Sequence, residues 1–125
     1  MVKVIKLPIP DKVLSPNARV NRYVKSSATK THRELSKRET YRSMKNWGLP
    51  IGTYYVTSIE LVAFWKTSRH KRDDVNLMAS CKAYEDGIQD ALGQDDSTWS
   101  MDRPQHYVSP KEPRLEIHIH IQTLD

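Results

Sequence analysis

Residues 54–65 have the sequence YYVTSIELVAFW, and this stretch decides the fold. β-Branched and aromatic residues dominate it, so it predicts the best-defined strand of the chain. Its continuous apolar end, residues 61–65, is typical of a central strand whose two faces are both covered. We therefore expect the other elements to be arranged around this strand.

Three further strands are expected nearer the ends of the chain. Residues 114–123 alternate, which predicts one buried face; its apolar members are Leu115, Ile117, Ile119 and Ile121. Residues 2–9 alternate less regularly and run into prolines; the expected apolar face is Val2, Val4 (then Ile5) and Leu7, set against lysines. Residues 98–101 follow a turn at residues 93–97 and precede a proline-rich stretch, so they predict a shorter strand.

The sequence also predicts two helices. The first begins at Thr29 or Thr31 and runs to Trp47, before a glycine and a proline; its thin apolar stripe is Leu35, Tyr41, Met44 and Trp47. The preceding residues 19–30 are basic and poor in apolar side chains, a composition compatible with partial disorder. The second helix covers residues 74–92; its core stripe is Leu77, Cys81, Tyr84, Ile88 and Ala91 or Leu92.

Composition and charge limit the classes of protein. A length of 125 residues predicts a single domain, residues 1–125, with one modest core. The net charge of +5 and the pI near 9.4 favour an anionic partner, although basic charge also serves solubility. One cysteine excludes an intramolecular disulfide, and no apolar run approaches the roughly 20 residues that span a bilayer. Lysines interrupt any signal-peptide core, so we expect a cytoplasmic protein, in a bacterium or a phage-infected cell, without a membrane partner.

Acidic and basic residues cluster around the second helix. Residues 71–76 read KRDDVN, Lys82 and Asp86 continue a helical stripe that begins at Val75, and a second acid pair stands at residues 95–96. Carboxylates are the usual ligands of Mg²⁺, and neighbouring bases would meet an anionic substrate. Ordinary roles are also open: either acid pair could form a cap or a turn, and Lys82 and Asp86 could form a solvated ion pair worth about 0.3 kcal/mol. Together, the order of acids and bases indicates a nuclease or another phosphoryl-transfer site.

Other chemistries lack their motifs. There is no Gly-rich phosphate loop, which argues against a nucleotide cofactor, and no Cys/His zinc spacing or Gly-x-Ser-x-Gly elbow. His118 and His120 share one polar strand face and could bind a transition metal, but no third ligand of matching type lies nearby. A half-exposed strand accounts for both histidines equally well. Cys81, on the apolar stripe, is expected in the core and not as a nucleophile.

This arrangement resembles the RusA family of Holliday junction resolvases, the small crossover junction endodeoxyribonucleases of bacteriophages and prophages. The resemblance covers most of the chain: residues 14–19 (LSPNAR), 72–76 (RDDVN), 82–88 (KAYEDGI), 90–92 (DAL) and 95–97 (DDS) are similar to the family's motifs. It implies an α+β fold, a mixed sheet with helices packed on it, and a homodimer. It also implies incision of symmetric strands at a four-way DNA junction, in recombination and repair, with Mg²⁺ as cofactor and Mn²⁺ as substitute.

The resemblance assigns roles to individual residues. Asp73 matches the first acid of the family's Asp-x-Asp-Asn motif, Lys82 its catalytic lysine and Asp96 its later acid. Catalysis and Mg²⁺ binding would use Asp73, Asp96 and, beside the motif position, Asp74. The supporting residues are Asn76, Asp86 and Asp95. Phosphate contacts are expected from Arg19, Arg22, Lys25, Lys30, Arg69, Lys71 and Arg72.

The chain departs from the family at one position. Val75 stands where the motif has its second aspartate, and Asp74 is the candidate substitute. If Asp74 does not serve, one metal ligand is missing. Two alternatives therefore stay open: a nuclease of branched or flapped DNA in phage replication or packaging, and a catalytically impaired protein that binds DNA junctions.

Overall fold

The computed structural model describes residues 1–68, 73–94 and 99–124 of the chain. The elements are, in order, β1 (Val2–Leu7), the 3₁₀ turn η1 (Lys12–Leu14), α1 (Arg22–Met44), β2 (Tyr54–Trp65), α2 (Asp74–Ser80), α3 (Lys82–Leu92), β3 (Ser100–Met101), β4 (Gln105–Val108) and β5 (Arg114–Thr123). The bounds of β2 and β5 confirm the prediction, and β1 stops before Pro8.

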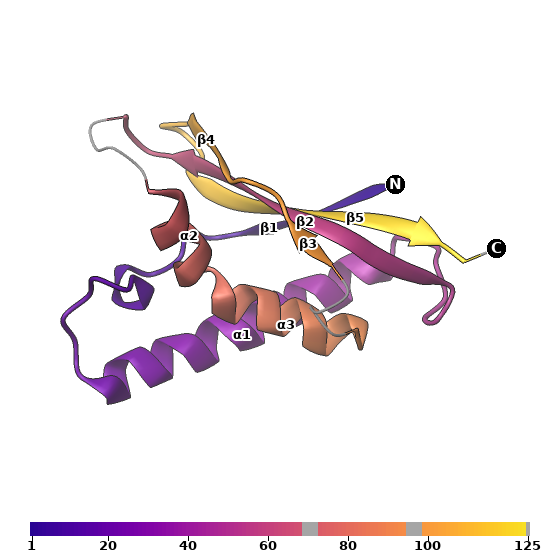
Figure 1. Ribbon diagram of the computed structural model, residues 1–125, viewed down its shortest axis with the longest axis horizontal. Helices are drawn as coiled ribbons and strands as arrows, with labels where there is room; N and C mark the ends of the chain where they lie inside the picture. Colours follow the sequence, from indigo (N-terminus) through magenta and orange to yellow (C-terminus); the bar gives the residue numbers. More distant parts are fainter. Residues whose placement is uncertain (69–72, 95–98, 125) are drawn as a thin grey trace.

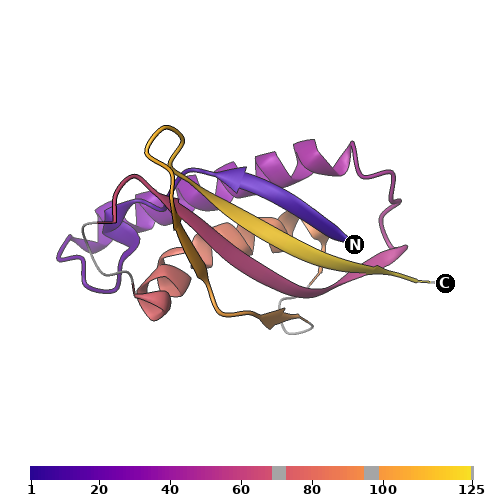
Figure 2. The same ribbon diagram turned by 90° about the horizontal axis from the view of Figure 1, so that it is seen from above.

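β2 is the centre of the sheet, as its apolar sequence predicts. It pairs antiparallel with β5, which pairs antiparallel with β1, while β3 and β4 lie parallel along the other edge of β2 (Figure 2). The sequence does not predict β4, because Pro104 and Pro110 flank it and are typical of a loop. An edge strand tolerates such prolines, since one side of its backbone needs no partner. The mixed sheet of five strands, with its helices, confirms an α+β domain.

The helices of the described chain lie on one face of the sheet (Figure 1). α1 and α3 pack against each other, and α1 also contacts β1. The alternating face of β5 and the apolar stripe of α2 and α3 meet between the two layers, as predicted. The core is formed by Ile5, Leu7, Tyr54, Val56, Ile59, Leu61, Ala63, Leu77, Cys81, Tyr84, Ile88, Leu92, Trp99, Leu115, Ile117, Ile119 and Ile121. Burial raises the pKa of the Cys81 thiol, which confirms its place in the core.

The buried face of β1 differs from the prediction. Ile5 and Leu7 are buried, whereas Val2 and Val4 are exposed on the opposite face. The register sets Val4 beside His118, on the polar side of β5. Side chains alternate strictly along a strand, so burying Ile5 and Leu7 sends Val2 and Val4 to the other face. The prediction was wrong because it combined residues of both faces.

α1 starts at Arg22, earlier than the predicted Thr29 or Thr31. The side-chain oxygen of Asn21 caps it by accepting a hydrogen bond from the Val24 N–H at 2.9 Å. The segment for which partial disorder was expected is therefore largely helical. Its first turns lack an apolar stripe, so the period of the helix is invisible in the sequence. Among the described residues, no helix is long and apolar enough to cross a membrane.

The predicted helix over residues 74–92 is divided at Cys81, which ends α2 and precedes α3. The N–H of Cys81 is shared between the carbonyls of Leu77 and Met78. The hydroxyl of Ser80 donates to the carbonyl of Asn76 at 2.8 Å, a contact that bends helices. The core stripe survives this bend, because all of its predicted members stay buried.

Candidate functional site

Asp73 is the N-cap residue of α2. Its Oδ1 accepts a hydrogen bond from the backbone N–H of Asn76 at 3.0 Å, which satisfies one of the free donors at the start of the helix. The capping role considered for the first acid pair is thus confirmed for Asp73. This bond engages one carboxylate oxygen, and the group has a second oxygen for another partner.

A cavity of about 550 Å³ opens beside this cap. Asp73 and Asn76 line it together with Ser15, which belongs to the loop of residues 14–19. Two segments of the resemblance, 14–19 and 72–76, therefore meet at one cavity. The other polar side chains in its wall are Asp11, Lys12 and Ser80.

Asp11 brings a second carboxylate to this cavity, and the sequence analysis does not predict it. Asp11 Oδ1 caps η1 by accepting a hydrogen bond from the Val13 N–H at 3.0 Å. The Asp11 N–H donates to His32 Nε2 at 3.1 Å, and His32 Nδ1 donates to the carbonyl of Ala28 at 2.8 Å. With both ring nitrogens engaged, His32 fixes this wall of the cavity to α1. The only sequence signal for Asp11 is its position directly after a strand and a pair of prolines.

Asp74 is held by two donors. His106 Nε2 lies 2.6 Å from its Oδ1, and Arg103 Nε lies 2.9 Å from its Oδ2. The hydrogen bonds from His106 and from Arg103 lower the pKa of the Asp74 carboxyl. Trp65 Nε1 donates to His106 Nδ1 at 3.0 Å, so the hydrogen-bond network assigns the ring proton to Nε2, where Asp74 accepts it. We call Trp65, Arg103 and His106 the Asp74 clamp, because they fix this carboxylate to β2 and to the chain around β4.

The sequence does not predict the Asp74 clamp. Arg103 and His106 come from a stretch that has no regular apolar period and lies well beyond the second helix. The parallel pairing of β4 with β2 sets His106 beside Ala63 and brings it to Trp65 and Asp74. No local signal reveals this pairing, so only the fold identifies these partners.

Lys82 lies at a different cavity. It lines a second hollow of about 550 Å³ together with Val75 and Ala79, which confirms the predicted stripe. Lys82 Nζ lies 3.3 Å from Asp86 Oδ1, so the ordinary i,i+4 ion pair is also confirmed. Val75 is 72% exposed. The capped acid and the lysine therefore line separate cavities in the described part of the chain.

Several predicted site residues lie outside the described residues, namely Arg69, Lys71, Arg72, Asp95 and Asp96. Of the other predicted phosphate contacts, Arg19, Arg22 and Lys30 are exposed, and Lys25 is half-buried. The guanidinium of Arg22 lies 5.3 Å from the ring centroid of Tyr23. These basic side chains stand at and before the first turns of α1, where an anionic partner can reach them.

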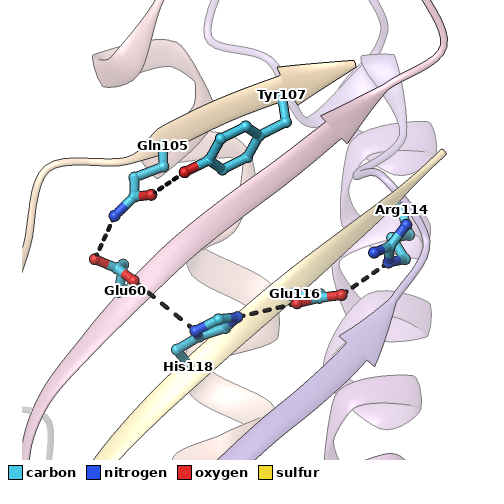
Figure 3. A network of polar contacts seen from close by, with 6 residues as sticks. All are labelled: Glu60, Gln105, Tyr107, Arg114, Glu116 and His118. Atoms are coloured by element: carbon cyan, nitrogen blue, oxygen red, sulfur yellow. Dashed lines mark hydrogen bonds and ion pairs between the residues drawn. The ribbon is translucent and has the colours of Figure 1, made fainter. Parts of the chain in front are cut away.

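The open face of the sheet carries a polar network (Figure 3). Glu116 accepts hydrogen bonds from Arg114 Nε at 2.8 Å and from His118 Nε2 at 3.0 Å, and His118 Nδ1 lies 3.9 Å from Glu60. Burial opposes ionisation of Glu116, but the bonds from His118 and Arg114 outweigh it and lower the pKa. His118 is thus engaged by carboxylates. Within residues 1–68, 73–94 and 99–124, no group of three His, Cys, Asp or Glu side chains is arranged to hold a metal ion.

Comparison with known proteins gives limited information on function. No protein-family model matches the chain. An uncharacterized protein of Xylella fastidiosa (strain Temecula1) is 38% identical over 96 residues, which cover 74% of this chain and 59% of that protein. The chain thus spans less than two thirds of the relative that it matches.

Proposed function

We propose that this chain is a metal-dependent endodeoxyribonuclease that binds four-way DNA junctions as a homodimer and nicks symmetric strands. One observation carries the proposal: the cavity beside α2 gathers Asp73 and Asn76 with Ser15. These residues belong to 72–76 and 14–19, two of the segments through which the chain resembles the RusA family. A shared active site requires both segments to meet, whereas unrelated surface segments have no reason to do so.

Mg²⁺ is the proposed cofactor, and the described side chains fit it in part. Asp73 fits, because it is exposed, lines a cavity and uses only one carboxylate oxygen to cap the helix. Mg²⁺ needs few protein ligands and keeps several waters, so one available carboxylate oxygen can contribute to its site. Asp74 does not fit in this arrangement, because Arg103 and His106 already engage both of its oxygens. We therefore propose Asp73 and Asp96 as the principal ligands. When bound, Mg²⁺ or Mn²⁺ would supply a Lewis acid that activates water and neutralises the scissile phosphate.

The chain's own bases would act on the substrate through charge. Lys82 carries a compact ammonium that can position a phosphate once the phosphate replaces Asp86 as its ion-pair partner. The exposed Arg19, Arg22 and Lys30 would contact the DNA backbone and make binding sensitive to salt. A two-fold dimer suits the reaction, because a junction must be nicked at two symmetric positions.

Cleavage of a labelled synthetic four-way junction tests the proposal directly. The reaction is run with Mg²⁺, with Mn²⁺ and with chelator, beside a linear duplex of the same sequence and a flapped substrate. Paired symmetric nicks that disappear with chelator and are absent from the duplex would support the proposal. Equal cutting of flaps and junctions would assign the chain to the broader class of branched-DNA nucleases. No cutting with either metal would refute the proposed enzymatic activity.

A second candidate is a protein that binds junctions without cutting them. The Asp74 clamp favours it, because the start of α2 then offers one available acid where the family motif has two. The exposed Val75 supplies no replacement. Junction binding that persists without any nicking would select this candidate.

A further inference from the structure

The solvent-facing side of α1 carries a basic surface that neither the candidate active site nor the resemblance uses. The helix has seven Lys or Arg residues against two Glu. Its inner side packs on α3 through the buried Ser36 and Thr40. On the outer side we define the α1 basic surface as Lys37, Arg38, Tyr41, Arg42 and Lys45, all of which are exposed.

These side chains surround a hollow of about 450 Å³. Glu34 is the one acid in its wall, against four bases, so the hollow is strongly positive. Tyr41 is 45% exposed, and Lys37 Nζ lies 6.0 Å from the centroid of its ring. Tyrosine hydroxyls and the heads of Lys and Arg are groups that contact DNA phosphates. The surface therefore has the charge and the donors that a phosphate backbone requires.

The charges of this surface are only partly neutralised within the described protein. Arg38 and Lys45 have no ion-pair partner among residues 1–68, 73–94 and 99–124, and only Arg42 has one, Glu39 at 3.1 Å. Like charges crowded on one helix face are destabilising by a few tenths of a kcal/mol per pair. An anionic ligand would remove that repulsion, whereas a purely solvated helix has no need to concentrate it.

The length of α1 matches the geometry of duplex DNA. Its 23 residues extend roughly 34 Å, close to one turn of the double helix. The N-terminal end carries Arg22 and Lys30, which are already assigned to phosphate contacts. We propose that the α1 basic surface binds the backbone of double-stranded DNA, as a second contact along one arm of the substrate. This inference takes DNA as the ligand from the proposed function and does not depend on catalysis.

Binding of a labelled linear duplex, measured with chelator over a series of salt concentrations, tests this contact without cleavage. Arg38→Gln/Lys45→Gln removes two charges and keeps residues that favour a helix. The matched control Lys6→Gln/Lys111→Gln removes two exposed charges, one from β1 and one from the segment between β4 and β5. The slope of log K against log salt is negative, and its magnitude is expected to fall by about 1.8 in the first variant, because each phosphate contact contributes about 0.9. The control is expected to keep the wild-type slope.

The charge-preserving variant Arg38→Lys/Lys45→Arg completes the design. It is expected to keep the wild-type slope, which separates loss of charge from loss of fold. Equal slopes for the Gln variant and its control would overturn the proposal. The proposal would also be overturned if the Gln variant kept the wild-type duplex slope but lost binding to a polyglutamate peptide. That result would assign the surface to an acidic protein partner. Failure of the proposed function would appear instead as absent nicking by the wild-type chain with Mg²⁺, which this assay does not measure.

Discussion

Gly87 of α3 lies so close to Ser36 of α1 that a methyl group on Gly87 would stand 1.9 Å from Ser36 Oγ. The same methyl group would stand 2.3 Å from the carbonyl oxygen of Arg33, which belongs to the backbone and cannot rotate away. Ser36 Oγ also donates to the carbonyl of Tyr84 at 2.8 Å. The two helices therefore meet almost backbone to backbone. The pair supports the sheet, and α1 also fixes the wall of the candidate cavity through His32.

The substitution Gly87→Ala is expected to destabilise the protein by about 2 kcal/mol. Overpacking costs about 1–3 kcal/mol, and the upper end applies here because the Arg33 backbone must move. The better helix propensity of alanine returns up to about 1 kcal/mol. Urea unfolding measures the change. The double variant Ser36→Gly/Gly87→Ala is expected to recover only part of the loss, because the Arg33 carbonyl remains in the way. A Gly87→Ala protein as stable as the wild type would contradict the close approach.

Asp73→Asn is expected to abolish junction cleavage while junction binding and stability persist. Asparagine caps a helix as well as aspartate does, so the bond to the Asn76 N–H survives and only the negative charge is lost. Cleavage, binding and thermal unfolding are measured on the same protein. Asp73→Ala is the contrasting variant: it loses the charge and the cap together and is expected to cost about 1 kcal/mol of stability as well. Wild-type cleavage by Asp73→Asn would refute the metal-site assignment.

The strands could be predicted from the sequence where a single face carries the apolar residues. Leu115 to Ile121 alternate without interruption, and β5 has the predicted bounds and buried face. β1 fails this test, because Val4 and Ile5 are both apolar and only the pairing with β5 decides between them. The start of α1 fails for another reason: the Asn21 cap is a local signal, but no apolar period follows it.

The site could be predicted only in its local parts. Asp73, Asn76 and Lys82 stand in recognisable motifs, and the cap and the i,i+4 pair follow from their spacing. His106 reaches Asp74 only because β4 runs parallel to β2, a pairing between segments about 40 residues apart. Asp11 and Asp73 line one cavity only because the residues after β1 lie beside α2. Such contacts depend on the topology of the fold, so a local sequence motif does not predict them.

Glu116→Gln is expected to flatten the acid limb of the stability profile. The folded-state pKa of Glu116 lies below its usual value, so its contribution to stability is complete above about pH 4.5 and is lost as the pH falls through the folded-state pKa. Melting temperatures measured from pH 3 to pH 7 should therefore fall less steeply in the variant than in the wild type. Glu112→Gln is the matched control, because Glu112 is exposed and lies 3.8 Å from Arg114. An acid limb of equal steepness in the wild type and Glu116→Gln would contradict the network of Figure 3.

Val75→Asp is expected to raise junction cleavage by roughly tenfold, since a single group that supports a metal site typically changes metal affinity or activity by about 10–100-fold. Position 75 is exposed in the first turn of α2, where a negative charge is favourable to the helix, so the fold should tolerate it. The new carboxylate would line the hollow of Lys82 and not the cavity of Asp73, so a gain in cleavage would indicate that the two hollows serve one metal site. Val75→Asn matches the shape without the charge and is expected to stay at the wild-type rate. An equal gain from both variants would trace the effect to polarity alone, and no gain from either would contradict the expectation that Val75 leaves the site one ligand short.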